Sequence, residues 1–385
     1  MKLIQNVNLS LRCTLIVFLL FGIWGPNYTG LKKLFYNVYS FFILMFILGI
    51  YIIVQVGDLI QVWGNLPLMT ATIFLLFTNI ALGTKLLNVM WRKDTIRAML
   101  EETNDELCNE SRQTGKEIVR SCDRETTKQL SVYFVLSYTT VLGWASSAEK
   151  NQLPLRAWYP YDTSKTPTYQ LTYAHQTIAV SLAAAINICL DTLVTSLICQ
   201  CRCRLRLLAL SLRTLCHDLD GAMTDASSTI VSERLQNCVV RHQTVLAQTK
   251  LLQNCFSASI FAQFCVSMII ICVTAYQLAF ESTSLARVIS MVAYLTVMML
   301  QVFLYCYQGN QLVEESEGVS GAAYECPWYI LNIPIRRSLL LVMTRTRRAA
   351  RLTAAGFTEL SLSSFMSIIK ASYTFFTVLQ QIEED

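Results

Sequence analysis

Residues 34–57 have the sequence LFYNVYSFFILMFILGIYIIVQVG, a stretch of 24 residues in which no side chain carries a charge. An α-helix rises about 1.5 Å per residue, so roughly 20 apolar residues are needed to cross the hydrocarbon core of a bilayer, which is about 30 Å thick. This stretch meets that requirement. We therefore expect it to form a helix that spans a membrane.

The composition of the whole chain agrees with this expectation. Of its 385 residues, 54% are hydrophobic and 15% are charged, and the mean hydropathy is +0.43. A soluble protein has about a quarter of its residues charged. Six further segments are long and apolar enough to span, at about residues 66–90, 129–147, 171–198, 255–281, 286–308 and 356–382. The sequence therefore predicts an all-α, polytopic membrane protein, with residues 1–385 forming a single seven-helix membrane domain.

The last of the seven segments is the most polar, and hydropathy alone ranks it last. Between Phe357 and Ile382 it carries Glu359, Lys370, two glutamines and several serines and threonines. Ionisable side chains inside a membrane almost always face protein or a water-filled cavity. We therefore expect that this helix does not face lipid all round.

The N-terminal segment, residues 1–33, is expected to lie in the cytoplasm. It contains an apolar run from Leu11 to Trp24 that is too short to span and stops at Gly25-Pro26, so we predict a re-entrant or interfacial segment at 11–24. The competing interpretation is a secretory signal peptide, because Lys2 and Arg12 accompany the run. No small-x-small cleavage site follows it.

The distribution of basic residues sets the expected orientation. Of the 31 lysines and arginines, 25 fall in the N-terminal segment and in the second, fourth and sixth loops, three fall in the other loops, and three fall within spans. Basic loop residues stay on the cytoplasmic side of a membrane. We therefore predict a cytoplasmic N-terminus and an extracellular C-terminus. The 14 cysteines agree, because none of them lies in a predicted outer loop, where disulfides would form.

Three stretches of the chain carry a family resemblance. The first is Trp158-Tyr-Pro-Tyr-Asp162 with Pro167-Thr-Tyr-Gln170 and Gln176. The second is Tyr307-Gln-Gly-Asn-Gln-Leu312 with Glu315-Ser316, Ala322-Ala323-Tyr324 and Trp328. The third is Ile368-Ile-Lys-Ala-Ser-Tyr-Thr-Phe-Phe-Thr-Val-Leu379 in the last span. In this order, within an inverted seven-helix frame, they resemble the insect odorant receptors, and the 56-residue fourth loop is shorter than that of the family's co-receptor.

The resemblance implies an odorant-specific subunit of a ligand-gated, non-selective cation channel. In that family four subunits, including the co-receptor, surround one pore in the plasma membrane of sensory neuron dendrites. The resemblance also implies that the inner loops extend their helices into the cytoplasm as an anchor domain between subunits. Runs such as 96–108 and 205–215, apolar on a helical period, are compatible with such packing. Ordinary amphipathic helix ends at the membrane surface are the alternative.

The resemblance places the pore on the outer half of the last helix. Its narrowest apolar ring matches Val378 and Ile382, which lie four residues apart and so share a helix face, with Gln381 beside them. Such a ring can gate by dewetting. Glu383, Glu384 and Asp385 would stand at the outer mouth and concentrate cations, or would form a frayed acidic tail. Lys370 lies about 80° around the helix from Val378, so we expect it beside the pore.

The same resemblance implies an apolar odorant pocket in the outer half of the membrane. Its candidate lining comes from four spans, namely Phe74, Phe77, Thr78, Ser137, Thr140, Trp144, Ile178, Leu182 and Tyr294. A volatile odorant needs a lining of this kind. An aromatic residue in a span is also often plain packing, which is the alternative for each of these aromatic residues.

Other chemistry has less support. Cys199, Cys201 and Cys203 could bind zinc, could be palmitoylated at a juxtamembrane position, or could be inert thiols. No metal site, cofactor, nucleic-acid partner or enzyme motif is indicated, and the three histidines are scattered.

Two other membrane functions remain as alternatives. A metabotropic seven-helix receptor has its N-terminus outside, and its acidic-Arg motif ends the third span, whereas Asp123-Arg124 precedes that span here. A transporter would show inverted repeats with broken helices, and no convincing repeat is present.

Overall fold

The computed structural model describes residues 8–25, 30–146, 153, 155–163, 165–217, 225–280 and 285–384, and the side chains of residues 66, 67 and 382–384 lie outside this description. Almost all described residues are helical, and the predicted all-α membrane fold is confirmed. The helices are α2 (Leu9–Leu20), α3 (Leu31–Leu44), α4 (Ile50–Gln61), α5 (Leu66–Trp91), α6 (Lys93–Cys108), α7 (Gln113–Ser146), α8 (Thr168–Arg213), α9 (Asp225–Phe280), α10 (Leu285–Glu325), α11 (Ile333–Thr346) and α12 (Leu362–Glu384).

Short irregular elements complete the fold. A π-helical turn, η1 (Met45–Gly49), joins α3 to α4 without interrupting the helix, and a 3-10 turn, η2 (Trp328–Ile330), precedes α11. The strands β1 (Thr353–Ala354) and β2 (Thr358–Glu359) form a small antiparallel hairpin in which Thr353 pairs with Glu359 and Ala354 with Thr358. Gly356 in its loop has a φ of 77°, a left-handed conformation that a glycine adopts without steric strain.

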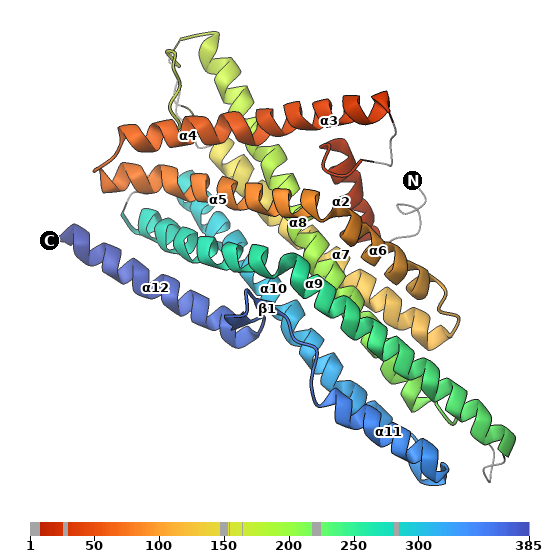
Figure 1. The fold of residues 1–385 in the computed structure, drawn as a ribbon. Helices are drawn as coiled ribbons and strands as arrows, with labels where there is room; N and C mark the ends of the chain where they lie inside the picture. Colours follow the sequence, from red (N-terminus) through yellow and green to blue (C-terminus); the bar gives the residue numbers. More distant parts are fainter. Residues whose placement is uncertain are drawn as a thin grey trace.

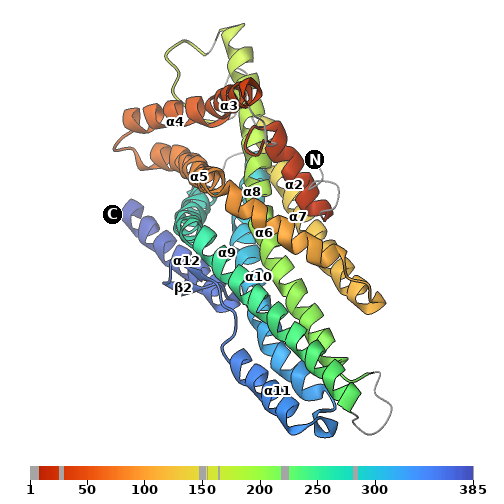
Figure 2. The same cartoon turned by 45° about the vertical axis from the view of Figure 1, so that its right-hand side comes forward.

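Seven helical passes run along the described part of the chain, as α3–α4, α5, α7, α8, α9, α10 and α12. Figure 1 shows α7, α8, α9 and α10 crossing the middle of the molecule, with α8, α9 and α10 continuing towards α11, while the C-terminal end of α12 lies away from α11. The four long helices extend past their predicted inner span ends, as expected for cytoplasmic extensions. This leaves α12 along one edge of the bundle, in contact with α9 and α10 (Figure 2).

The expectation that hydropathy ranks the seventh span last was wrong. Among the described residues, six helices are long and apolar enough to cross a membrane, and they include α12 but not α7. The polar residues of α7 explain the difference, because Tyr133, Ser137 and Thr140 are buried against the bundle and lower the hydropathy of the helix. On its other side Val135 and Leu142 are exposed and apolar. The third pass is therefore a helix whose polar side faces protein.

The start of α12 is fixed by a close approach of two backbones. The seventh span begins at Leu362, six residues later than predicted, because the preceding residues form the β1–β2 hairpin. Gly309 of α10 lies directly against Leu360, and a Cβ atom at this position would collide with the Leu360 side chain and carbonyl oxygen. The hairpin also bonds to α9, where Ser257 Oγ donates to the carbonyl oxygen of Thr353 at 2.8 Å. The base of α12 is thus held by both α9 and α10.

Ion pairs hold together the helix extensions that lie beyond the predicted spans. Arginines of α8 reach carboxylates on three other helices, as Arg202 Nη1 to Glu125 Oε1 of α7 at 2.8 Å, Arg206 Nε to Glu315 Oε1 of α10 at 2.5 Å, and Arg204 to Glu106 of α6. The guanidinium groups of Arg202 and Arg204 are almost fully buried. Removing one partner of a buried pair costs about 3–5 kcal/mol, so these contacts specify how the extensions pack.

The short helix α2 packs against α8 and α7 with Leu11, Leu15 and Phe18 buried. It ends at Leu20 and is followed by a turn in which the backbone N–H groups of Ile23 and Trp24 both donate to the carbonyl oxygen of Phe18. A helix of 12 residues is too short to span. The re-entrant or interfacial role of residues 11–24 stays a prediction.

Candidate functional site

Four helices enclose a mostly apolar cavity between their outer halves. Its volume is about 70 Å³, counted as the space that the centre of a water molecule can occupy. Five of the nine predicted pocket residues line it, namely Thr78, Ser137, Thr140, Trp144 and Tyr294. These residues come from α5, α7 and α10, and α8 supplies the fourth wall. The structure therefore brings together residues that are up to 216 positions apart in the sequence.

An aromatic cluster forms one side of this cavity. The ring centroid of Tyr294 lies 5.1 Å from that of Trp144 and 5.5 Å from that of Phe74, and Phe74 lies 5.9 Å from Trp144. Phe74 is thus packed behind the two rings that line the cavity. The Tyr294 hydroxyl lies 2.6 Å from Thr78 Oγ1, and Thr78 Oγ1 also lies 2.7 Å from the carbonyl oxygen of Phe74.

Four predicted pocket residues do not line the cavity, namely Phe74, which lies behind its aromatic side, and three that lie elsewhere. Phe77 packs beside the buried hydrophobic cluster that contains Trp144 and Tyr294. Leu182 packs against a separate, larger hydrophobic cluster that contains Ile186 and Leu190 of α8. Ile178 has half of its surface exposed. The α8 wall is instead formed by Val180, Ala183, Ala184, Asn187 and Ile188. Because α8 is apolar on all sides in this region, its sequence gave no signal for the face that turns inward.

Sequence reasoning also missed lining residues on the other three helices. They are Leu75, Asn79, Leu82, Val141, Val297 and Met298. Most of them stand three or four residues from a predicted position, as Val141 does from Ser137 and Met298 from Tyr294. Extending each predicted helix face by one turn would have found them.

A buried polar network forms the inner side of the cavity. Asp191 of α8 accepts four hydrogen bonds, from Lys85 Nζ at 2.6 Å, Tyr305 Oη at 2.8 Å, Tyr133 Oη at 2.8 Å and Gln301 Nε2 at 2.5 Å. Lys85 Nζ also donates to Oδ1 of Asn187, which lines the cavity, at 2.9 Å. We call these six residues the Asp191 network. A carboxylate with four donors has all of its acceptor sites in use, so the buried charge is compensated.

This network connects the cavity to the helix that touches α12. Within α10, Tyr294, Val297 and Met298 line the cavity, while Gln301 and Tyr305 bond to Asp191. Between the latter two, Phe303 contacts Phe365 of α12 edge to face with ring centroids 5.6 Å apart. One rigid helix therefore carries the cavity wall, the buried ionic contact and the contact with α12.

Two of the predicted pore residues lie on the exposed side of α12. Val378 and Gln381 are exposed, whereas the side chain of Ile382 lies outside the described residues, as do those of Glu383, Glu384 and Asp385. Only 11% of the residues in the most apolar stretch of α12 are buried within the chain. Its exposed polar residues follow a spacing of four and three, as Ser363, Ser367, Lys370, Thr374 and Gln381. At 100° per residue they fall on one face, each within about 40° of the direction of Ser363.

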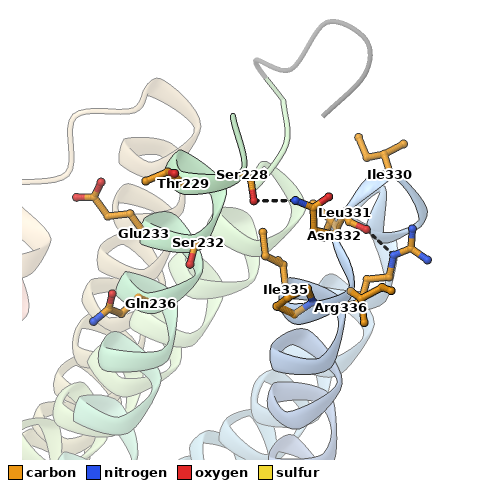
Figure 3. A pocket seen from close by; sticks show the side chains of 12 residues that line it. Ser228, Thr229, Ser232, Glu233, Gln236, Ile330, Leu331, Asn332, Ile335 and Arg336 are labelled. Carbon is orange, nitrogen blue, oxygen red and sulfur yellow. Dashed lines mark hydrogen bonds between the residues drawn. The ribbon is translucent and has the colours of Figure 1, made fainter. Parts of the chain in front are cut away.

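Two other hollows are larger than this cavity and lie outside the predicted spans. One has a volume of about 840 Å³ and opens between α9 and the start of α11, where Asn332 Nδ2 donates to Ser228 Oγ at 2.9 Å (Figure 3). The other, of about 740 Å³, lies at the ends of α6 and α8 and is lined by Arg112, Arg234, Arg241 and polar residues. Both are open and polar, and neither fits the lining expected for a volatile ligand.

The cysteine cluster at the inner end of α8 is buried. Cys199 and Cys203 face Cys122 of α7, whereas Cys201 points to the main core. Among the described residues, no group of three or more His, Cys, Asp or Glu side chains could hold a metal ion. An acyl chain on any of these buried thiols would have to displace the helix packing. Hydrogen bonds from Cys199 and Cys203, with the charges of Arg206 and Arg202, lower the pKa of the Cys122 thiol.

Comparisons with known proteins agree with the geometry. The family model described as 7tm Odorant receptor matches residues 65–373. Among curated proteins, Odorant receptor Or1 of Anopheles gambiae is 25% identical, over 94% of this chain and 93% of its own length. Odorant receptor 46a, isoform A, of Drosophila melanogaster is 26% identical over 84% of this chain and 86% of its own length.

Among solved structures, the chain is similar to the insect olfactory receptor OR5 from Machilis hrabei. The structure of that receptor in complex with eugenol superposes with a TM-score of 0.81 at 20% identity and covers 97% of each chain. A second structure of the same receptor gives a TM-score of 0.78 at 21% identity, covering 96% of this chain and 97% of the other. The fold is therefore shared over nearly the whole length.

Proposed function

Since the chain belongs to the insect odorant receptor family, as an odorant-specific receptor rather than the co-receptor, we propose that it is a subunit of a ligand-gated, non-selective cation channel. A small volatile odorant binds in the cavity between α5, α7, α8 and α10, and α12 opens the pore. The family consists of receptors that cross a membrane several times, and not of enzymes.

The polar face of α12 is the observation that carries the channel proposal. Serine and threonine hydroxyls can donate a hydrogen bond to a backbone carbonyl oxygen of their own helix. Thr374 Oγ1 does so with the carbonyl oxygen of Lys370 at 3.1 Å. Lys370 has no such option, and no hydrogen bond or ion pair is present for its ammonium group within the described residues. A lysine facing lipid at mid-membrane costs about 3 kcal/mol. This face of α12 therefore meets water or another subunit in the assembled protein.

The gate is proposed at Val378 and Ile382, with Gln381 beside them. A ring of such residues from several subunits closes a pore by excluding water, and a small rotation of α12 widens it. The Phe303–Phe365 contact provides the mechanical connection, because α10 carries both the cavity wall and the ring that packs on α12. Odorant binding shifts the position of α10, and α12 follows.

The partner is the co-receptor, in a complex of four subunits at the plasma membrane of a sensory neuron dendrite. The cytoplasmic end of the chain offers a surface for assembly. Leu340 and Leu341 of α11 and Tyr329 before it are each at least 62% exposed. An exposed apolar patch of this kind marks a contact with another protein, so we place the anchor between subunits here.

Co-expression tests this proposal. Odorant-evoked current is recorded in cells that express the chain with the co-receptor, the chain alone, or the co-receptor alone, with G-protein activity blocked by a non-hydrolysable GDP analogue in the pipette. We expect odorant-evoked current from the pair that persists under the block. A response that disappears under the block would mean that the chain is a metabotropic receptor and would overturn the channel proposal.

A further inference from the structure

The polar atoms of the cavity differ in what they can still bond. We propose that the cavity selects odorants that carry a hydroxyl group, so that alcohols and phenols bind better than carbonyl compounds or hydrocarbons of the same size. This inference rests on the proposed function, because it takes the cavity to be the odorant site. The inference follows from which hydroxyl hydrogens of the lining residues are already used in hydrogen bonds within the protein.

The first step concerns Thr78. Its Oγ1 atom lies 2.7 Å from the carbonyl oxygen of Phe74, and a carbonyl oxygen only accepts hydrogen bonds. Two oxygen atoms at this distance repel unless a hydrogen lies between them, so Thr78 must donate its single hydroxyl hydrogen to Phe74. At 2.6 Å from the same Oγ1, the Tyr294 hydroxyl must then supply the hydrogen of the second bond.

The consequence falls on Tyr294, which is almost fully buried and lines the cavity. Its hydroxyl hydrogen is used by Thr78, and its oxygen keeps a free lone pair. Tyr294 can therefore accept a hydrogen bond from a ligand without losing any bond. To donate to a ligand carbonyl it would have to break the bond to Thr78 and leave a buried group unpaired.

The other polar lining residues have committed part of their donor capacity. Thr140 Oγ1 donates to the carbonyl oxygen of Leu136 at 3.1 Å, and Asn79 Nδ2 donates to Gln55 Oε1 at 3.0 Å. Asn187 Nδ2 donates to the Tyr133 hydroxyl at 3.3 Å. Within the described residues Ser137 Oγ has no hydrogen-bond partner, and a hydroxyl can serve a donor or an acceptor equally. Each amide nitrogen keeps a second hydrogen, so the expected discrimination concerns a ligand polar group placed beside Tyr294, whose single hydroxyl hydrogen is committed.

The aromatic side of the cavity indicates suitable probes. Benzyl alcohol, benzaldehyde and ethylbenzene have a ring that fits against Trp144 and Tyr294 and contain the same number of non-hydrogen atoms. They differ only in presenting a hydrogen-bond donor, a carbonyl acceptor or neither. One neutral hydrogen bond changes affinity by roughly 3- to 10-fold.

The test measures binding and gating separately. Binding to the detergent-purified chain is read from the ligand concentration that raises the melting temperature, and gating from current with the co-receptor present. We expect benzyl alcohol to bind roughly 3- to 10-fold more tightly than the other two compounds. Equal or tighter binding of benzaldehyde or ethylbenzene, or no binding of any, would overturn the inference. Preferential binding of the alcohol without any evoked current would contradict the proposed function and leave the ligand preference standing.

Three variants separate a role in recognition from a role in packing. Tyr294→Phe removes the acceptor, so we expect the alcohol preference to vanish while ethylbenzene still binds. Thr78→Val frees the hydroxyl hydrogen of Tyr294, so we expect benzaldehyde to gain affinity, which a packing defect would not produce. Tyr138→Phe is the control, because the Tyr138 hydroxyl bonds to the carbonyl oxygen of Ser181 outside the cavity lining. Loss of the preference in this control, or its survival in Tyr294→Phe, would refute the assignment.

Discussion

Replacing Lys85 by methionine removes one charge from the Asp191 network and leaves the other in place. The side chains of Lys85 and Asp191 are 6% and 2% exposed, and Nζ lies 2.6 Å from Oδ1. Methionine keeps the length of the lysine side chain and its apolar contacts. The substitution therefore changes the electrostatics of the network with little change in volume.

The expected loss can be worked from these contacts. At an effective dielectric constant of about 20, two charges 2.6 Å apart attract by about 6 kcal/mol. Part of this is offset by the desolvation of both groups, and breaking a buried pair on one side costs about 3–5 kcal/mol in practice. Tyr133, Tyr305 and Gln301 still donate to Asp191 after the change. We therefore expect a loss of stability near the lower end of this range, about 3 kcal/mol. A loss of this size lowers the melting temperature of a chain of this length by about 5 °C.

The assay is thermal unfolding of the purified chain together with its amount at the cell surface. Lys85→Met should lower both, and the double variant Lys85→Met, Asp191→Asn should recover most of the loss because no unpaired charge remains. Lys250→Met removes an exposed lysine of α9 and should change neither quantity. A Lys85→Met chain as stable as Lys250→Met, or a double variant less stable than Lys85→Met, would refute the reasoning.

Three further changes have defined outcomes. Gly309→Ala should destabilise by about 1–3 kcal/mol because its Cβ collides with Leu360, whereas Gly321→Ala on the same helix meets no atom within 4 Å and should stabilise by up to about 1 kcal/mol in the same melting experiment. Burial, with the charge of Arg345, lowers the pKa of His242 below 6.5, so stability should fall as the pH drops below about 6.5, and His242→Gln should remove this dependence from a melting-temperature profile. Val378→Ala or Ile382→Ala should alter basal current, whereas Trp144→Ala should chiefly shift the odorant concentration for half-maximal current, and dose–response recordings showing the reverse would mean that gate and pocket are exchanged.

The predicted fold followed largely from properties that are local in sequence. Apolar length located a segment in each of α3–α4, α5, α7, α8, α9, α10 and α12, and the loop charges predicted an orientation. The boundary of α12 could not be predicted, because contacts with Gly309 of α10 and Ser257 of α9, from other parts of the chain, hold the hairpin that precedes it. The ranking of α7 failed for a related reason. Its polar residues are satisfied by the bundle, and hydropathy does not distinguish a polar side facing protein from one facing lipid.

The candidate site was predicted only where one helix supplied a regular pattern. Ser137, Thr140 and Trp144 lie three and four residues apart, and all three line the cavity. On α8 no pattern distinguished the side of Ile178 from that of Asn187, and the prediction chose the wrong side. The pairing of Lys85 with Asp191 joins positions 106 residues apart, and nothing in the spacing of either helix predicts it.

The central claim is that α12 of this chain lines the cation pathway, and cysteine modification of Gln381 tests it most directly. Gln381 is exposed near the outer end of α12, and a cysteine there can be reached by a membrane-impermeant, positively charged thiol reagent in the bath. Leu142→Cys, on the exposed apolar side of α7, is the control. With the co-receptor present, the reagent should block odorant-evoked current of Gln381→Cys and leave Leu142→Cys unchanged. Current that is unaffected at Gln381→Cys, or equally reduced in both variants, would contradict the account.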